Sequence, residues 1–150
     1  MFSAKNVLLP VRGDLVNEDA FRLACTLAKG AKGKIRAIYV IEVKRELPLD
    51  AEIAYETSRG EESLAQIESL AKAEKCPLDA DILQARQAGP AIVQEAASKE
   101  ADVIVVGVEC RPLDDGITVG QTASYVLEHA HCPVLLWRAA PARHDPPQRD

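Results

Sequence analysis

Short apolar runs alternate along this chain with longer segments in which apolar residues recur every three or four positions. The runs predict β-strands buried on both faces, and the longer segments predict amphipathic helices. Strands are expected at 6–10, 34–43, 79–83, 103–107 and 134–137. Helices are expected at 17–30 and 61–75, from Gly89 onward, and from Gly120 to Ala130. Because strand and helix alternate throughout, the sequence predicts an α/β protein, a three-layer α/β/α sandwich around a five-stranded parallel sheet.

Local chemistry sets several of the expected boundaries. Asn17 is expected to cap the first helix, since its side chain can accept hydrogen bonds from the free amides there. Gly30 is expected to end that helix. The second helix could begin as early as Asp50. The run at 79–83 alternates polar with apolar residues, which predicts a strand at the edge of the sheet.

The composition, with 47% hydrophobic and 27% charged residues, is that of an ordinary globular domain. One domain is expected over 1–138, followed by a disordered, proline-rich tail at 139–150. The net charge of -5 argues against nucleic acid or an anionic membrane as the main partner. No apolar run approaches the roughly 20 residues of a membrane span. The first residues also lack the pattern of a secretion signal.

Four cysteines, Cys25, Cys76, Cys110 and Cys132, are scattered without a CxxC pair. Their spacing argues against a metal site and against a disulfide framework. We therefore expect reduced thiols and a cytoplasmic protein. Only Cys110 falls in an open loop, where an unreactive thiol is the favoured interpretation because reactivity needs a lowered pKa.

The strongest candidate for a binding site is the stretch from Asp102 to Thr122. A buried strand is followed there by a polar segment, 108–119, expected to be a loop, and then by a helix that starts at Gly120. Glycine lets the backbone approach a ligand closely, and the free amides of a helix start attract anions. The pattern suits one half of a phosphate or nucleotide site. A plain strand-to-helix connection is the commoner explanation for such a stretch.

The order of the strands decides whether the loop after the first strand lies beside the loop after the fourth. In doubly wound sheets ligands bind beyond the carboxyl ends of the strands, where the winding reverses direction. If the order is 3-2-1-4-5, the reversal falls between the first and the fourth strand. Residues 10–14 would then lie opposite 107–122, and the two loops would border one crevice.

No catalytic residue is assigned. His129 and His131 flank the end of the last helix, where the helix dipole already stabilises a histidine. Asp114 and Asp115 could hold Mg²⁺ beside a triphosphate, but a solvated turn is the favoured interpretation. No nucleophile, base and orienting acid can be assembled from the sequence.

Four segments resemble the universal stress protein family: NVLLPVRG, IYVIEV, ADVIVVG and VLEHAHCPVLLWR. The resemblance covers about residues 5–138. It implies a Rossmann-like, adenine nucleotide alpha hydrolase-like fold with strand order 3-2-1-4-5. It also implies a homodimer formed by pairing of the fifth strand, through Val134, Leu135, Leu136 and Trp137. Trp137 is expected in that seam, far from the carboxyl ends of the first and fourth strands.

Nucleotide-binding members of that family carry a glycine signature that this chain keeps only in part. Gly107 and Gly120 stand at its first and third glycines, and Cys110 stands at the second. Gln121 replaces the usual serine or threonine. Arg12 stands where an aspartate often contacts the nucleoside; a guanidinium cannot accept hydrogen bonds, although it suits a phosphate.

The resemblance implies a cytoplasmic, homodimeric stress-response regulator that binds ATP or AMP, with Mg²⁺ only alongside the nucleotide, and without efficient catalysis. The candidate contacts are Pro10, Val11, Arg12, Val40, Val106, Gly107, Cys110, Gly120, Gln121 and Thr122. The alternative is a member that binds no nucleotide and acts as a dimeric scaffold for an unknown protein partner. A nucleotide hydrolase is the third hypothesis, and no residue pattern supports it.

Overall fold

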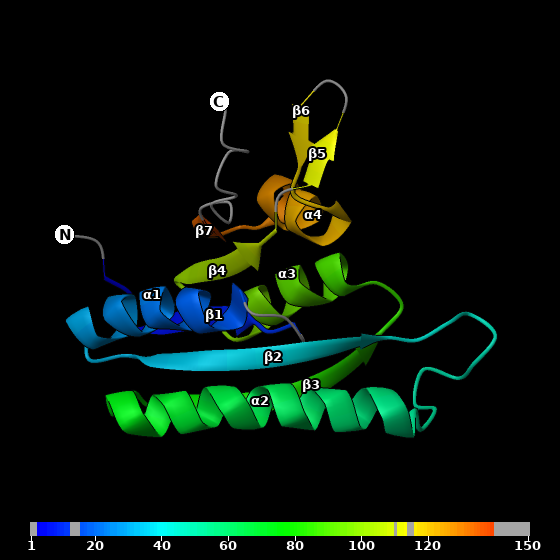
Figure 1. Ribbon diagram of the computed structural model, residues 1–150, viewed down its shortest axis with the longest axis horizontal. Coiled ribbons are helices and arrows are strands. Elements are labelled where there is room, and N and C mark those ends of the chain that lie inside the picture. The colour runs from blue at the N-terminus through cyan, green and yellow to red at the C-terminus, as the bar shows by residue number, and fades with distance from the viewer. Residues whose placement is uncertain (1–2, 13–15, 110, 114–115, 140–150) are drawn as a thin grey trace, which may run out of the picture.

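A five-stranded parallel sheet forms the middle layer of the protein (Figure 1). The computed structural model describes residues 3–12, 16–109, 111–113 and 116–139. The strands of the sheet are β1 (Asn6–Pro10), β2 (Lys34–Glu42), β3 (Leu78–Ala85), β4 (Val103–Val108) and β7 (Val134–Arg138). Their order is β3-β2-β1-β4-β7. Since β7 is the fifth strand of this sheet in chain order, the predicted class and the order 3-2-1-4-5 are confirmed.

Four helices cover the two faces of the sheet. Helices α1 (Val16–Gly30) and α2 (Ala54–Glu74) share one apolar core with it, and α3 (Ala88–Ser98) and α4 (Gln121–His129) share the other. None of the helices described is long and apolar enough to cross a membrane.

β1 shows why the strand runs are uniformly apolar. Val7 and Leu9 lie in the core under α1 and α2, whereas Leu8 lies in the core under α3 and α4. All three side chains are at most 1% exposed. A central parallel strand has no face toward water, so alternation of polar and apolar residues disappears.

β3 lies at an edge of the sheet, as its alternating pattern predicts. Its outward carboxylates pair with cations of β2: Asp79 accepts from Lys34 Nζ at 2.9 Å, and Asp81 accepts from Arg36 at 3.3 Å. These are exposed cross-strand ion pairs, each worth at most about 1 kcal/mol. They fix the register of the edge strand more than they stabilise the fold.

The start of α1 differs from the prediction. The helix begins at Val16, so Asn17 lies inside its first turn and is not the cap. Instead, Asn17 Oδ1 accepts a hydrogen bond from the Arg12 backbone N–H at 3.0 Å. The amide side chain therefore ties the helix to the end of β1. α2 begins at Ala54, later than Asp50 and earlier than Glu61.

The segment after β4 also differs from the prediction of a plain loop. Two short strands, β5 (Arg111–Leu113) and β6 (Gly116–Thr118), pair antiparallel in a hairpin that stands away from the sheet (Figure 1). Three-residue strands give too little periodicity to be recognised in a sequence. Asp114 and Asp115 lie outside the described residues.

Cys25 and Cys76 are free thiols packed in the core under α1 and α2. Burial, together with the neighbouring Cys25 thiol, raises the pKa of Cys76 to about 12. Cys132 is also a free thiol, and burial raises its pKa as well. Cys76 and Cys132 are therefore protonated near neutral pH.

Gly33, between α1 and β2, is required by a close approach of two backbones. A Cβ at this position would overlap the backbone of Lys5. The same contact brings the Lys34 nitrogen within 2.8 Å of Lys5 O, in a hydrogen bond just before the pairing of β1 with β2. Glycine at 33 thus lets the sheet pairing begin.

We expect Gly33→Ala to lower the free energy of unfolding by about 2 kcal/mol, because the added methyl must push two backbones apart. Urea unfolding measures this change. Gly30→Ala is the matched control: its Cβ would meet only the Ser3 Cβ at 3.1 Å, and alanine suits a helical residue. Equal losses for the two variants would contradict the close-approach argument.

The raised pKa of Cys76 predicts a loss of stability in alkaline solution. The unfolded thiol ionises from about pH 9, whereas the folded thiol holds its proton to about pH 12. Unfolding therefore releases a proton above the lower value, and stability falls as pH rises through this interval. Urea unfolding from about pH 8 to about pH 10 should show a shallower fall for Cys76→Ala than for the wild type. Identical slopes would disprove the assignment.

Candidate functional site

A cavity of about 490 Å³ opens beyond the carboxyl ends of β1, β2 and β4. Its floor comes from strand ends and the residues after β1. The floor residues are Pro10, Val11, Arg12, Tyr39, Val40, Glu42, Val106 and Gly107. Its walls come from three helices. The wall residues are Glu56 and Arg59 of α2, Ala88 and Ile92 of α3, and Thr122 and Ala123 of α4.

A smaller hollow of about 270 Å³ adjoins the cavity at the start of α4. Thr118, Val119, Gly120 and Gln121 line it, together with Glu109, Arg12 and Thr122. Arg12 and Thr122 also line the larger cavity. The two hollows therefore lie side by side, with Arg12 and Thr122 between them, and together they form a cleft from the strand ends to the helix start.

The cleft brings together nine of the ten candidate contacts. Pro10, Val11, Arg12, Val40, Val106, Gly107 and Thr122 line the cavity, and Gly120 and Gln121 line the hollow beside it. Cys110, the tenth, lies outside the described residues. The segments on either side of the reversal between β1 and β4 face one another, as the strand order requires.

The start of α4 has no side-chain cap. Gly120 has φ 89° and ψ 164°, a backbone conformation that only glycine adopts readily. Its N–H donates to Thr118 Oγ1 at 3.2 Å, and no side chain caps the helix. The first backbone amides of α4 therefore have no hydrogen-bond partner within the helix. They form the positive end of the helix dipole.

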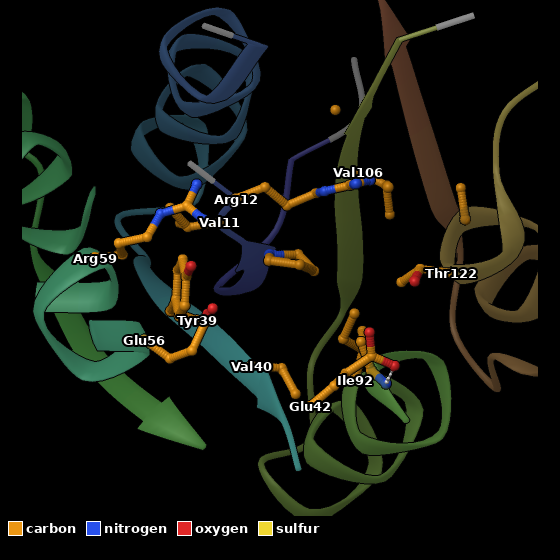
Figure 2. A pocket seen from close by; sticks show the side chains of 14 residues that line it. Val11, Arg12, Tyr39, Val40, Glu42, Glu56, Arg59, Ile92, Val106 and Thr122 are labelled. Carbon is orange, nitrogen blue, oxygen red and sulfur yellow. Dashed lines mark hydrogen bonds between the residues drawn. The ribbon is translucent and has the colours of Figure 1, made fainter. Parts of the chain in front are cut away.

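Four charged side chains line the cavity (Figure 2), and only Arg12 was recognised from the sequence. Glu42 ends β2, and its Oε2 accepts the N–H of Ala88 at 3.2 Å at the start of α3. Glu56 and Arg59 face the cavity from the first two turns of α2 (Figure 2). Arg59 also lies over the ring of Tyr55, with 5.8 Å between the guanidinium carbon and the ring centroid.

The remaining lining residues were missed for different reasons. Glu42 stands at the carboxyl end of β2, and this position could have identified it as a lining residue, because ligands bind beyond the carboxyl ends of the strands. Glu56 and Arg59 could not be placed because the start of α2 was uncertain between Asp50 and Glu61. Tyr39, Ala88, Ile92 and Ala123 look like ordinary core residues in the sequence, and most of their surface is indeed buried.

Trp137 lies closer to this end of the sheet than the sequence suggested. The register of β4 and β7 pairs it with Gly107, a residue of the cavity floor. The prediction that Trp137 lies far from the carboxyl end of β4 is therefore wrong. The mistake came from treating the final strand as a dimer seam only, whereas parallel neighbours bring their carboxyl ends together.

His129 and His131 lie at the other end of α4 from the cleft. The His129 ring stacks on Tyr125, with centroids 4.0 Å apart, and its Nδ1 lies 3.0 Å from Tyr125 O. Both histidines are exposed. Among the residues with described positions, no group of three His, Cys, Asp or Glu could hold a metal ion.

Comparison with known proteins identifies the family to which the chain is similar. The universal stress protein family model matches residues 3–138. A universal stress protein of Methanocaldococcus jannaschii is 30% identical over 138 residues, covering 88% of this chain and 81% of that protein.

Solved structures share the fold at lower identity. A universal stress protein from Archaeoglobus fulgidus in complex with dAMP has a TM-score of 0.71 and 18% identity, covering 91% of this chain and 98% of that one. One from Arabidopsis thaliana with AMP bound has a TM-score of 0.68 and 18% identity, covering 94% and 97%. The family model spans nearly the whole chain and agrees with the observed topology, and the chain therefore belongs to the universal stress protein family.

Proposed function

We propose that this protein binds an adenine nucleotide, ATP or AMP, in the cleft between β1 and β4, and acts as a regulator without efficient catalysis. The observation that carries the proposal is that the two hollows lie side by side and share Arg12 and Thr122 in their linings. A ligand that fills both needs one end that combines apolar surface with polar groups, and one anionic end. A nucleotide has both.

The larger cavity suits a base and its ribose. Its volume of about 490 Å³ lies within the range of small-ligand sites. Val40, Ile92 and Val106 offer apolar surface for a ring, and Glu42 and Glu56 offer acceptors for amino or hydroxyl groups. The phosphate would lie in the smaller hollow, against the free amides of α4.

Relatives support the choice of ligand. The Archaeoglobus fulgidus and Arabidopsis thaliana proteins were solved with dAMP and AMP. Backbone amides make the phosphate cradle, so it does not depend on the side chain at Gln121. Mg²⁺ would enter only with a nucleotide that carries more than one phosphate.

Binding without efficient catalysis is the form of activity that we propose. The cleft residues with described side chains include no histidine or cysteine. Glu42, one of the carboxylates, already accepts a hydrogen bond from Ala88. The free thiols Cys25, Cys76 and Cys132 support a reducing compartment such as the cytoplasm.

Titration calorimetry with ATP, ADP and AMP in the presence of Mg²⁺ tests the proposal. We expect binding to the wild type, and loss of binding in Thr122→Phe, because the ring would fill the junction of the two hollows. Ser124→Phe is the control, since Ser124 is exposed on the same helix and lines neither hollow.

No heat and no thermal shift at millimolar ligand would reject nucleotide binding. That result would favour the scaffold hypothesis, with an unknown protein partner in place of the nucleotide. Binding that appears only in a Cys110→Gly, Gln121→Ser double variant would point the same way, since the two changes restore the signature of the family.

We also propose a homodimer that pairs β7 across a two-fold axis, through Val134, Leu135, Leu136 and Trp137. β7 is an edge strand, and its free backbone groups can continue the sheet into a second copy. Leu136 and, on the adjacent α4, Leu127 are 37% and 48% exposed. Apolar side chains at an unpaired edge favour association.

Leu136→Asp should convert the dimer to a monomer, because pairing would bury two uncompensated charges. Sedimentation equilibrium or light scattering measures the mass. Leu49→Asp serves as the control: Leu49 is 48% exposed, but it lies between β2 and α2, remote in sequence from β7. A wild-type mass equal to that of one chain would exclude the dimer.

A further inference from the structure

We infer that Arg12 is the specificity-determining residue of the cleft, and that it selects nucleoside phosphates over nucleosides. This inference rests on the proposed function and goes beyond it. The proposal above assigns the phosphate to the backbone amides of α4. The inference assigns a side chain as well, one whose charge is opposite to that of the family's usual aspartate.

Arg12 stands where the two parts of the cleft join. It lines both hollows, and Thr122 is the other residue that does so. Figure 2 shows its side chain leaving the end of β1 and extending toward Val106 on β4. The guanidinium therefore points toward the smaller hollow, at the start of α4.

The backbone holds Arg12 in this place. The N–H of Val11 donates to Ile38 O at 2.7 Å, which continues the pairing of β1 with β2. The N–H of Arg12 donates to Asn17 Oδ1 at 3.0 Å, which ties the same turn to α1. With both amides bonded, the base of the side chain is fixed, and less conformational entropy is lost when its tip contacts a ligand.

The electrostatics of the smaller hollow call for an anion. Arg12 and the start of α4 both present positive charge to it, so the two repel each other when nothing lies between them. Glu109 is a carboxylate on the same lining, but no ion pair joins it to Arg12. A phosphate placed there would contact both positive groups.

The two ends of the cleft differ in the groups that can receive an anion. Glu42 and Glu56 line the larger cavity and do not line the smaller hollow. Arg59 also lines the larger cavity and Glu109 also lines the smaller hollow, but only the smaller hollow is lined by Gly120 and Gln121, which open α4. A phosphate would therefore be favoured in the smaller hollow, between Arg12 and the free amides of α4. This polarity sets one orientation of the ligand, with the base toward β2 and α2 and the phosphate toward α4. A guanidinium suits this task because its planar fork can donate two hydrogen bonds to phosphate oxygens.

The test compares dissociation constants of AMP and adenosine, by calorimetry, in the wild type, Arg12→Gln, Arg12→Lys and Arg45→Gln. We expect the wild type to prefer AMP by about tenfold or more, as for hydrogen bonds between charged groups. Arg12→Gln should lose about tenfold in AMP affinity while adenosine affinity stays within about twofold. Arg12→Lys should recover part of the loss.

Arg45→Gln is the matched control for net charge. Arg45 is exposed near the same end of the sheet but lines neither hollow of the cleft. An unchanged preference for AMP in Arg12→Gln, with both ligands still bound, would overturn the inference and leave the proposed function intact. Absence of binding for both ligands in the wild type would overturn both. Thermal unfolding of each variant checks that the fold is kept.

Discussion

The hydrogen-bond ladder of β1 is the constraint on which the rest of the structure depends. β1 pairs in parallel with β2 along Asn6–Pro10 and with β4 at Val7 and Leu8. Its central side chains go alternately to the two apolar cores, so one short strand joins both helical layers to the sheet. Gly33 matters for the same reason, because it permits the approach that starts the pairing with β2.

The cleft is a consequence of this central position. The chain leaves β1 toward α1 on one face and returns from β4 toward α4 on the other, so the connections diverge and leave space between them. Backbone groups provide much of the chemistry of that space: the strand ends, the amides of α4 and the left-handed conformation of Gly120. Side chains such as Arg12 then add charge to that space.

The sequence predicted the fold well because a strand buried on both faces is a run of apolar residues, which is easily recognised in a sequence. The apolar run at Val103–Gly107 indicated an inner strand, and the alternation after Leu78 indicated an edge strand. The prediction that Asn17 caps α1 was wrong because the same side-chain oxygen can either accept from a helix amide or accept from the segment after β1, as it does here from Arg12 N–H. The β5–β6 hairpin was missed because each strand spans three residues, too few for a period to be read.

The sequence by itself therefore determined the class, the strand order through the family resemblance, and the two loops that border the cleft. The tertiary structure alone decided which charges meet there. Arg12 follows β1, Glu42 ends β2, and Glu56 and Arg59 lie on α2, so no spacing along the chain links these three parts. Apolar periodicity reports how each element contacts its own core, and it carries no information on the distance between polar side chains of different elements. That distance is fixed only when the sheet register and the helix starts are in place.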